Sequence, residues 1–260
     1  MNDINYIRLE EIDSTNSYIA SHIDSLQDAT VVCAFRQTAG RGQRGNSWES
    51  EPGKNITMSI LLKSPNILPS HQFEISEACA LAVANALGKY TQGITIKWPN
   101  DIYYLDHKIC GILIEHSLSG GKISHTIAGI GLNVNQRHFF SDAPNPISLA
   151  NIIGNETPLE TIIKDIANGF ISICQALPEE SERIHKFFLK NLYRINGSYP
   201  YRTNIDSVSI DNTETIPAGT VFNAEIIDIE PNGTIMLKTT TAIHAFAFKE
   251  ISFVLPSATV

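Results

Sequence analysis

The sequence has few cysteines, no surplus of positive charge and no long apolar run, and each absence excludes a class of protein. Its four cysteines include no C-x-x-C pair, which argues against a disulfide scaffold or a cysteine-based zinc site. Its 19 lysines and arginines are outnumbered by 27 aspartates and glutamates, so the net charge of −8 gives no global surface for nucleic acid. No apolar stretch reaches the length of a membrane span, and the N-terminus lacks the apolar core of a signal peptide.

The rest of the composition is typical of a cytoplasmic globular protein. The chain has 260 residues, of which 43% are hydrophobic, enough for one large domain with a small appendage. The eight histidines show no zinc-ligand spacing, so we expect no structural metal. We expect the cysteines to be reduced and mostly buried.

Hydrophobic periodicity predicts an α+β protein of two parts. A short helix should begin after the capping residues 13–16, and strands are expected at 30–37 and 55–62. Apolar residues at helical spacing predict helices over 69–90 and 157–177, with another helix after Pro178. Short β-rich segments lie between the first two of these helices.

The last part of the chain differs in character. Short strands and turns follow residue 195, and two strands flank Pro231, Asn232 and Gly233 as in a hairpin. The sequence therefore predicts a helix-rich domain over residues 1–195 and a small all-β module over residues 196–260.

A glycine- and arginine-rich loop is the first candidate site. Three of the eight arginines lie between Arg36 and Arg44, a local reversal of sign in an acidic protein. Gly40, Gly42 and Gly45 permit close backbone approach to a ligand, and arginine binds carboxylate or phosphate. Taken alone, this segment could equally be an ordinary solvated surface loop. Trp48, which follows it, could be a packing residue or a lid over a bound aromatic ring. No Gly-Lys-Ser/Thr follows, so it is not a Walker A loop.

Three later segments carry further polar candidates. Pro99 restricts the backbone of Trp98 to an extended conformation and marks a turn. After the turn, the side chains of Asn100 and Asp101 can project into a cleft, where Asp101 could bind Mg²⁺ together with phosphates. Lys108 enters an apolar strand in which Gly111 predicts a close contact. Asn133, in the glycine- and asparagine-containing segment 129–135, is expected on a strand near a nucleotide. Each segment alone also fits an ordinary structural role.

The order of these segments closely resembles the catalytic domain of biotin–protein ligases. The motifs are DSTN (13–16), RQTAGRGQRGNSW (36–48), KWPNDIYY (97–104), HKICGILIE (107–115) and GIGLNVN (129–135). The resemblance implies the mixed-sheet catalytic domain of the biotin/lipoate–protein ligase type, and the C-terminal strands resemble that family's SH3-like barrel.

The resemblance implies that ATP and biotin, with Mg²⁺, form biotinyl-5′-AMP, from which biotin passes to a lysine of a biotin carboxyl carrier protein. Electrostatics and positioning then suffice, without a side-chain nucleophile. By resemblance, Lys108 and Arg41 are catalytic. The implied biotin site is Ser14, Thr15, Asn16, Gln37, Gly40, Arg41, Gly42, Gln43, Lys108 and Gly111. The implied ATP site is Arg44, Trp48, Asn100, Asp101 and Asn133, with Asp101 also towards the metal.

Two departures from the family pattern affect the expected function. Some relatives carry an N-terminal helix-turn-helix and repress transcription, whereas here the first motif begins at residue 13. We therefore expect neither a repressor role nor a DNA partner, and no membrane partner. Position 43 is glutamine where some relatives have arginine, so retention of the reactive adenylate could be weaker or could be unaffected. The oligomeric state stays open, a homodimer included.

Two other functions remain alternatives. A lipoate–protein ligase shares the fold and the adenylate chemistry, but its loop usually ends in a run of three glycines that this loop lacks. A binding module without catalysis would also retain the cleft, although intact Arg41, Lys108 and Asp101 argue against it.

Overall fold

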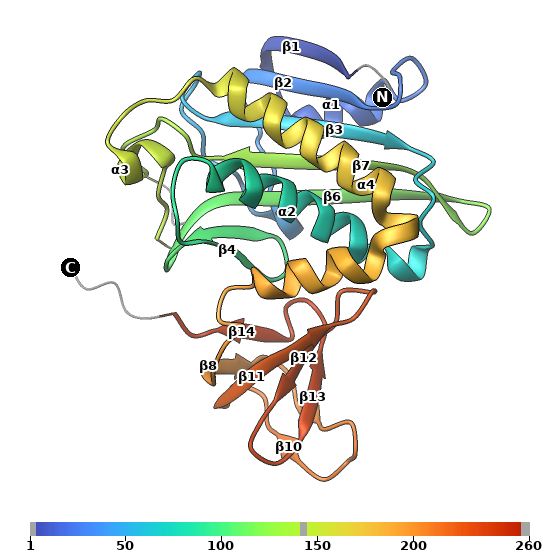
Figure 1. Ribbon diagram of the computed structural model, residues 1–260, viewed down its shortest axis with the longest axis vertical. Helices are drawn as coiled ribbons and strands as arrows, with labels where there is room; N and C mark the ends of the chain where they lie inside the picture. Colours follow the sequence, from blue (N-terminus) through green and yellow to red (C-terminus); the bar gives the residue numbers. More distant parts are fainter. Residues whose placement is uncertain (1–3, 141–144, 256–260) are drawn as a thin grey trace.

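A seven-stranded mixed sheet forms the centre of the larger part of the protein in the computed structural model, which describes residues 4–140 and 145–255 (Figure 1). The strand order is β1-β2-β3-β7-β6-β5-β4; β1 pairs in parallel with β2, and the other neighbours are antiparallel. The strands are β1 (Asn5–Ile12), β2 (Thr30–Gln37), β3 (Ile56–Lys63), β4 (Ile94–Lys97), β5 (Asp101–Tyr104), β6 (His107–Ser119) and β7 (Lys122–Leu132).

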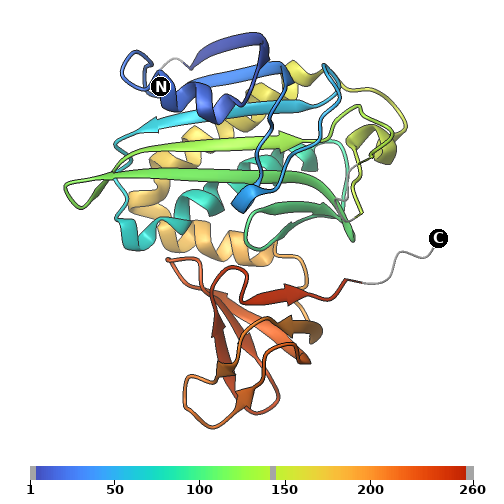
Figure 2. The same ribbon diagram turned by 180° about the vertical axis from the view of Figure 1, so that it is seen from behind.

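Helices cover one face of this sheet and leave the other face to loops and one short helix (Figures 1 and 2). The helices are α1 (Thr15–Ser21), α2 (Phe73–Gly88), α3 (Leu149–Ile153) and α4 (Leu159–Lys190), with 3-10 turns at η1 (Gln43–Gly45) and η2 (Pro69–His71). The alanine-rich α2 is buried along most of its length between the sheet and α4. Small side chains, such as those of Ala82 on α2 and Gly169 on α4, let the two helices approach closely. On the opposite face, α1 lies against β2, β3 and β7.

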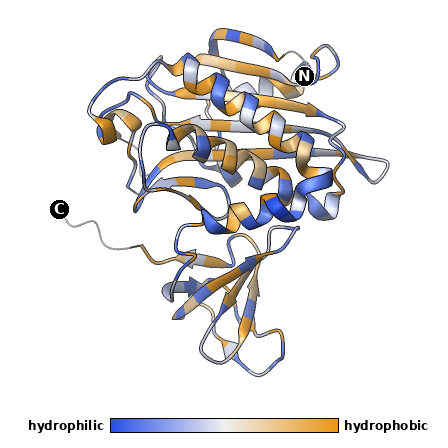
Figure 3. Ribbon diagram, in the orientation of Figure 1, coloured by the Kyte–Doolittle hydropathy of each residue, from blue (hydrophilic) through white to orange (hydrophobic). Residues whose placement is uncertain are grey.

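The helix α4 bends where the sequence predicts a break. Pro178 lies inside it, and Glu180 has non-helical angles of φ −124° and ψ 16°. Proline supplies no backbone N–H and clashes with the preceding turn, which accounts for the bend. The second half of α4 carries a larger share of hydrophilic residues, as Figure 3 shows.

The C-terminal strands form a separate antiparallel sheet of order β13-β12-β11-β8-β14. Among the described residues, no pairing joins the two edge strands, so the sheet does not close into a barrel and the predicted SH3-like barrel is not confirmed. The strands are β8 (Tyr199–Thr203), β11 (Val221–Ile229), β12 (Ile235–Lys238), β13 (Ile243–Phe246) and β14 (Ile251–Phe253), beside the two-stranded pair β9 (Ser207–Val208) and β10 (Thr215–Ile216).

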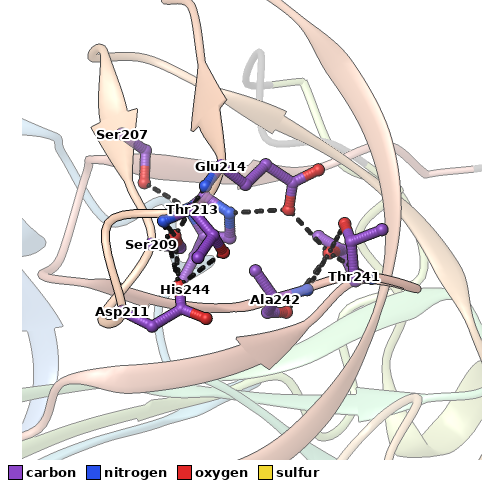
Figure 4. A network of polar contacts seen from close by, with 9 residues as sticks. Ser207, Ser209, Asp211, Thr213, Glu214, Thr241, Ala242 and His244 are labelled. Atoms are coloured by element: carbon purple, nitrogen blue, oxygen red, sulfur yellow. Dashed lines mark hydrogen bonds and ion pairs between the residues drawn. The ribbon is translucent and has the colours of Figure 1, made fainter.

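A polar network around the buried His244 links β9, the residue before β10 and β13 in this second part (Figure 4). The Oγ atom of Ser207 lies 2.9 Å from Nδ1 of His244, and Oε2 of Glu214 lies 3.1 Å from its Nε2. Thr239 also donates to Glu214. The hydrogen bonds from Thr239 and His244 lower the pKa of Glu214, and the bond from Thr239 has the larger effect. The chain Ser–His–Glu has the order of a nucleophilic triad, but His244 has no exposed surface, so the network is a polar core.

The two parts of the chain are joined by specific contacts. The indole N–H of Trp98 donates to the carbonyl of Gly233 at 3.0 Å, and the backbone N–H of Phe73 donates to the carbonyl of Pro231 at 3.1 Å. Gly233 has φ +92°, and a Cβ atom there would lie 2.9 Å from the Phe73 ring, so both conformation and space require glycine. The predicted hairpin turn thus docks onto the N-terminal end of α2.

Candidate active site

A cavity of about 220 Å³ lies where the N-terminal end of α1, the end of β2, the glycine-rich loop and strands β5 to β7 meet. Its lining includes most residues that the sequence singles out. These are Ser14, Thr15, Asn16, Gln37, Arg41, Gly42, Gln43, Trp48, Asn100, Asp101, Lys108 and Gly111.

Side-chain hydrogen bonds fix the polar end of this cavity, beneath α1. Ser14 occupies the N-cap position of α1 but makes no side-chain cap, contrary to the expected capping role. Instead, the backbone N–H and the hydroxyl of Thr15 donate to Oε1 of Gln37 at 2.8 and 3.1 Å. Both bonds use Oε1 of Gln37. Its amide nitrogen Nε2 has no acceptor among the described residues, so this group can donate a hydrogen bond to a ligand.

Two residues that the sequence analysis missed hold this polar end together. The hydroxyl of Ser59 on β3, fully buried, lies 2.6 Å from that of Thr15 and also contacts Oδ1 of Asn16. The carboxylate of Glu115 on β6 accepts from Nδ2 of Asn16 at 2.7 Å and pairs with Arg41 at 2.8 Å. Glu115 therefore ties the glycine-rich loop to the floor of the cavity. Its place at the end of the 107–115 motif was the one signal for it.

Three cationic side chains among the described residues line the cavity in an otherwise acidic protein. Nζ of Lys108 lies 2.6 Å from Oδ1 of Asp101, and Arg41 pairs with Glu115. The third is Lys97, which the sequence analysis did not assign to the site. Burial lowers the pKa of Lys97, while the neighbouring Asp101 opposes that change. Such a concentration of positive charge suits a ligand with carboxylate and phosphate groups.

The ring of Trp48 lies against two glycines that face each other across β6 and β7. Gly111 pairs with Gly131, and a Cβ atom at Gly131 would come 2.4 Å from Cε2 of Trp48. At Gly111 the corresponding distance to Cζ3 is 3.0 Å. The indole Nε1 of Trp48 is buried without a hydrogen-bond partner among the described residues. The paired glycines therefore make a flat seat for an aromatic ring, with Nζ of Lys108 5.8 Å from that ring's centroid.

A similar close contact explains Gly129. A Cβ atom there would lie 2.3 Å from Oδ1 of Asn16, so a larger residue would displace the polar end of the cavity. The glycines of the 129–135 segment thus make room for Asn16 and Trp48, a purpose that the sequence alone did not reveal.

Two described residues of the predicted site, Gly40 and Asn133, are absent from the cavity lining. Gly40 is packed under the carbonyl of Trp48. The side chain of Arg44 is outside the described part of the structure, so its predicted role is untested. Asn133 follows β7, rather than lying within a strand as expected, and its amide donates to the carbonyl of Ile147 at 3.1 Å. Its Oδ1 is buried without a partner among the described residues.

The described residues contain no group of three or more histidine, cysteine, aspartate or glutamate side chains that could hold a metal ion. They also contain no helix long and apolar enough to cross a membrane. The cysteines are free thiols, two buried and two partly buried, as expected.

Comparison with solved structures defines the class of fold. The chain resembles the biotin protein ligase from Aquifex aeolicus in complex with biotin and ATP, with a TM-score of 0.76 and 22% identity over 97% of this chain and 99% of that one. The biotin protein ligase from Leishmania major in complex with biotinyl-5-AMP gives a TM-score of 0.63 and 21% identity over 94% and 98%. The fold is therefore that of a biotin protein ligase.

Sequence comparison gives the family. Residues 9–133 match the model of the biotin/lipoate A/B protein ligase family. The bifunctional ligase/repressor BirA of Bacillus subtilis is 30% identical over 229 residues, 83% of this chain and 63% of the relative. The biotin–[acetyl-CoA-carboxylase] ligase of Paracoccus denitrificans is 35% identical over 129 residues, 48% of this chain and 53% of the relative. The matched part of the chain, residues 9–133, therefore belongs to the biotin/lipoate A/B protein ligase family. The alignments span between about half and two thirds of these relatives' lengths.

Proposed function

We propose that this protein is a biotin–protein ligase that forms biotinyl-5′-AMP from biotin and ATP and transfers biotin to a lysine of a biotin carboxyl carrier protein. The observation that carries the proposal is one cavity in which Lys97, Lys108 and Arg41 converge beside the polar cluster of Thr15 and Gln37. The names of the relatives, among them a biotin–[acetyl-CoA-carboxylase] ligase, support the choice of substrate and acceptor.

The cavity supplies what adenylate formation requires. An oxygen of the biotin carboxylate attacks the α-phosphorus of ATP, and the bond from that phosphorus to the departing pyrophosphate breaks. Two anions must approach each other, so Lys108 and Arg41 would neutralise charge where it concentrates. In this proposal Ser14, Thr15, Asn16, Gln37 and the loop from Gly40 to Gln43 hold biotin, and Trp48, Asn100, Asp101, Arg44 and Asn133 serve the nucleotide.

Magnesium would enter as the partner of ATP. Mg²⁺ commonly uses one or two carboxylates together with substrate phosphates. Asp101 lines the cavity and fits that role, and its ion pair with Lys108 would let the two share the phosphate charge. The metal would screen the phosphates, while Lys108 holds the reacting carboxylate.

The proposal extends to organisation and partners. Residues 1–195 would form the catalytic domain, and residues 196–260 an SH3-like module that contributes Phe248 to the cavity. The net charge of −8 offers no general surface for the DNA backbone, so the proposal includes a carrier protein but no DNA or membrane partner, in a cytoplasmic setting. A homodimer is compatible with it.

The test is ATP–pyrophosphate exchange with biotin and, separately, with lipoate, followed by transfer of labelled biotin to a purified carrier domain. Biotin-dependent exchange and labelling of the carrier lysine are expected. Exchange that requires lipoate would instead identify a lipoate ligase. Binding of biotin without any exchange would identify a non-catalytic module.

A further inference from the structure

A second cavity, of about 320 Å³, opens beside the first, between the N-terminal end of α2, strand β6 and the C-terminal module. Gln43, Pro99, Asn100, Ile112 and Phe248 line both cavities, so the two are neighbours that share a wall. The first carries the chemistry proposed above, whereas nothing in that chemistry uses the second.

The two cavities differ sharply in charge. The first is lined by Lys97, Lys108 and Arg41, whereas no lysine, arginine, aspartate or glutamate is among the described residues that line the second. Its walls are apolar at Phe73, Ile114 and the shared residues Ile112 and Phe248, with neutral polar groups between them. An anion such as pyrophosphate finds no counter-charge in such a cavity, whereas an aliphatic chain with a polar end matches it.

His116 is the one titratable side chain described in this second cavity, and it is held neutral. Its Nδ1 atom lies 2.8 Å from the hydroxyl of Thr126 on β7. Burial lowers the pKa of its imidazole, so the group adds no positive charge at neutral pH. A cationic or amine-bearing side chain would therefore meet no repulsion until it reaches the first cavity.

Gln43 stands at the junction of the two cavities with an unused acceptor. Its Oε1 atom is buried and has no hydrogen-bond partner among the described residues. A buried carbonyl oxygen without a donor is costly, and a donor entering from either cavity would relieve that cost. An amine is such a donor.

We propose that the second cavity is the entrance for the acceptor lysine, whose methylene chain lies along Ile112 and Ile114 and whose nitrogen passes Gln43 into the first cavity. The inference rests on the proposed ligase function. The ammonium group first loses a proton to solvent, which the nearby cations favour. The neutral nitrogen then attacks the acyl carbon of the adenylate; the C–N bond forms, the bond from that carbon to the phosphate oxygen breaks, AMP leaves, and the nitrogen releases one more proton to solvent.

The test narrows the second cavity and measures the two half-reactions separately. Ser76→Trp on α2 and Thr234→Trp on the C-terminal module fill it from opposite walls, and neither residue lines the first cavity. Ser70→Trp, at an exposed position just before α2, is the matched control. Biotin-dependent pyrophosphate exchange and trapping of the adenylate by hydroxylamine report the first step, and labelling of the carrier domain reports the second.

Both cavity variants should keep exchange and hydroxylamine trapping within about twofold of the native protein, yet lose tenfold or more in kcat/KM for the carrier domain. Undiminished transfer in both would overturn the entrance proposal alone. Loss of exchange together with transfer, in variants whose melting temperature is native, would assign the cavity to adenylation and also overturn it. Absence of biotin-dependent exchange in the native protein would instead refute the ligase function.

Discussion

Nζ of Lys108 lies 2.6 Å from Oδ1 of Asp101, an ion pair on the wall of the first cavity that joins the start of β6 to the start of β5. The side chains are only 23% and 14% exposed, so the pair is shielded from water on most sides. A partly buried charge needs a partner, and Asp101 holds Lys108 in one place until an anionic ligand arrives. The lysine is therefore oriented before it is used.

Lys108→Ala should slow biotin-dependent pyrophosphate exchange by two to three orders of magnitude, about 3–4 kcal/mol, the usual loss on removing one oriented charge-stabilising group. The melting temperature should fall only modestly, because Asp101 loses its partner but stays near the open cavity. Lys122→Ala, at the exposed first position of β7, is the control and should be active. Exchange at the native rate in Lys108→Ala would exclude Lys108 from the reaction.

Gly131→Ala should weaken ATP binding more than biotin binding. The added methyl would lie 2.4 Å from Cε2 of Trp48 and would push the indole off its seat on β6 and β7. We expect the KM for ATP in the exchange reaction to rise at least tenfold. Gly88→Ala is the control, because a Cβ atom there meets nothing within 4 Å. An unchanged KM would show that the seat of Trp48 is unrelated to the nucleotide.

Periodicity and turn residues predicted much of the fold. Strand β2, the helix pair α2 and α4, the bend after Pro178, and the hairpin at Gly233 follow from local sequence. Strand β1 was not predicted: it is an edge strand whose Ile7 and Leu9 face a small satellite core, and its charged residues obscure the alternation. Closure of the C-terminal sheet depends on pairing between distant strands, which local patterns do not specify.

The cavity was predicted less completely than the fold, for a physical reason. Lys108, Asp101 and Arg41, which the motifs single out, line the same cavity. Lys97, Glu115 and Ser59 were missed because each looks like an ordinary strand residue until the sheet register sets it beside its partner. Conversely, Asn133 is engaged by the backbone of Ile147 rather than by the cavity.

The free energy of unfolding should fall as the pH rises from about 6.5 to about 9. His185 on α4 lies 2.8 Å from Glu77 on α2 and 2.9 Å from Asp228 on β11. These two carboxylates raise the pKa of His185 to about 9, and the hydrogen bond to Glu77 has the largest effect. A histidine whose pKa rises on folding stabilises the native state fully at pH values below its pKa in the unfolded chain, about 6.5. This stabilisation is lost as the pH rises towards the pKa in the native state. Burial also raises the pKa of Glu77, whose contribution to stability likewise declines as pH rises, beginning above its unfolded pKa of about 4.5.

His185→Gln should lower the melting temperature at pH 6.5 and flatten its decline towards pH 9. His107→Gln, at an exposed position at the start of β6, should retain the native profile. Parallel profiles for His185→Gln and the native protein would show that the contact between α4 and the C-terminal module does not depend on this charge.

The native protein should retain its adenylate as well as a Gln43→Arg variant does. Two features hold the glycine-rich loop without an arginine at position 43. Arg41 is tied through Glu115 to Asn16, and the backbone N–H groups of Gly42 and Trp48 donate to the carbonyls of Asn46 and Gly40 at 2.7 and 3.0 Å. Closure therefore depends on backbone bonds and on a different arginine, while Lys108 and Lys97 supply charge nearby.

The measurement is labelling of a bystander protein that lacks an acceptor domain, incubated with biotin, ATP and each variant. Low and similar labelling is expected for native protein and Gln43→Arg. Arg41→Ala should label the bystander several times more heavily per adenylate formed, because it cuts the tie to Glu115 on which closure is argued to depend. The opposite result would be heavy labelling by the native protein and light labelling by Gln43→Arg. Position 43, and not the link between Arg41 and Glu115, would then control retention of the adenylate, because the charge missing at position 43 would matter more than the backbone hydrogen bonds of the loop.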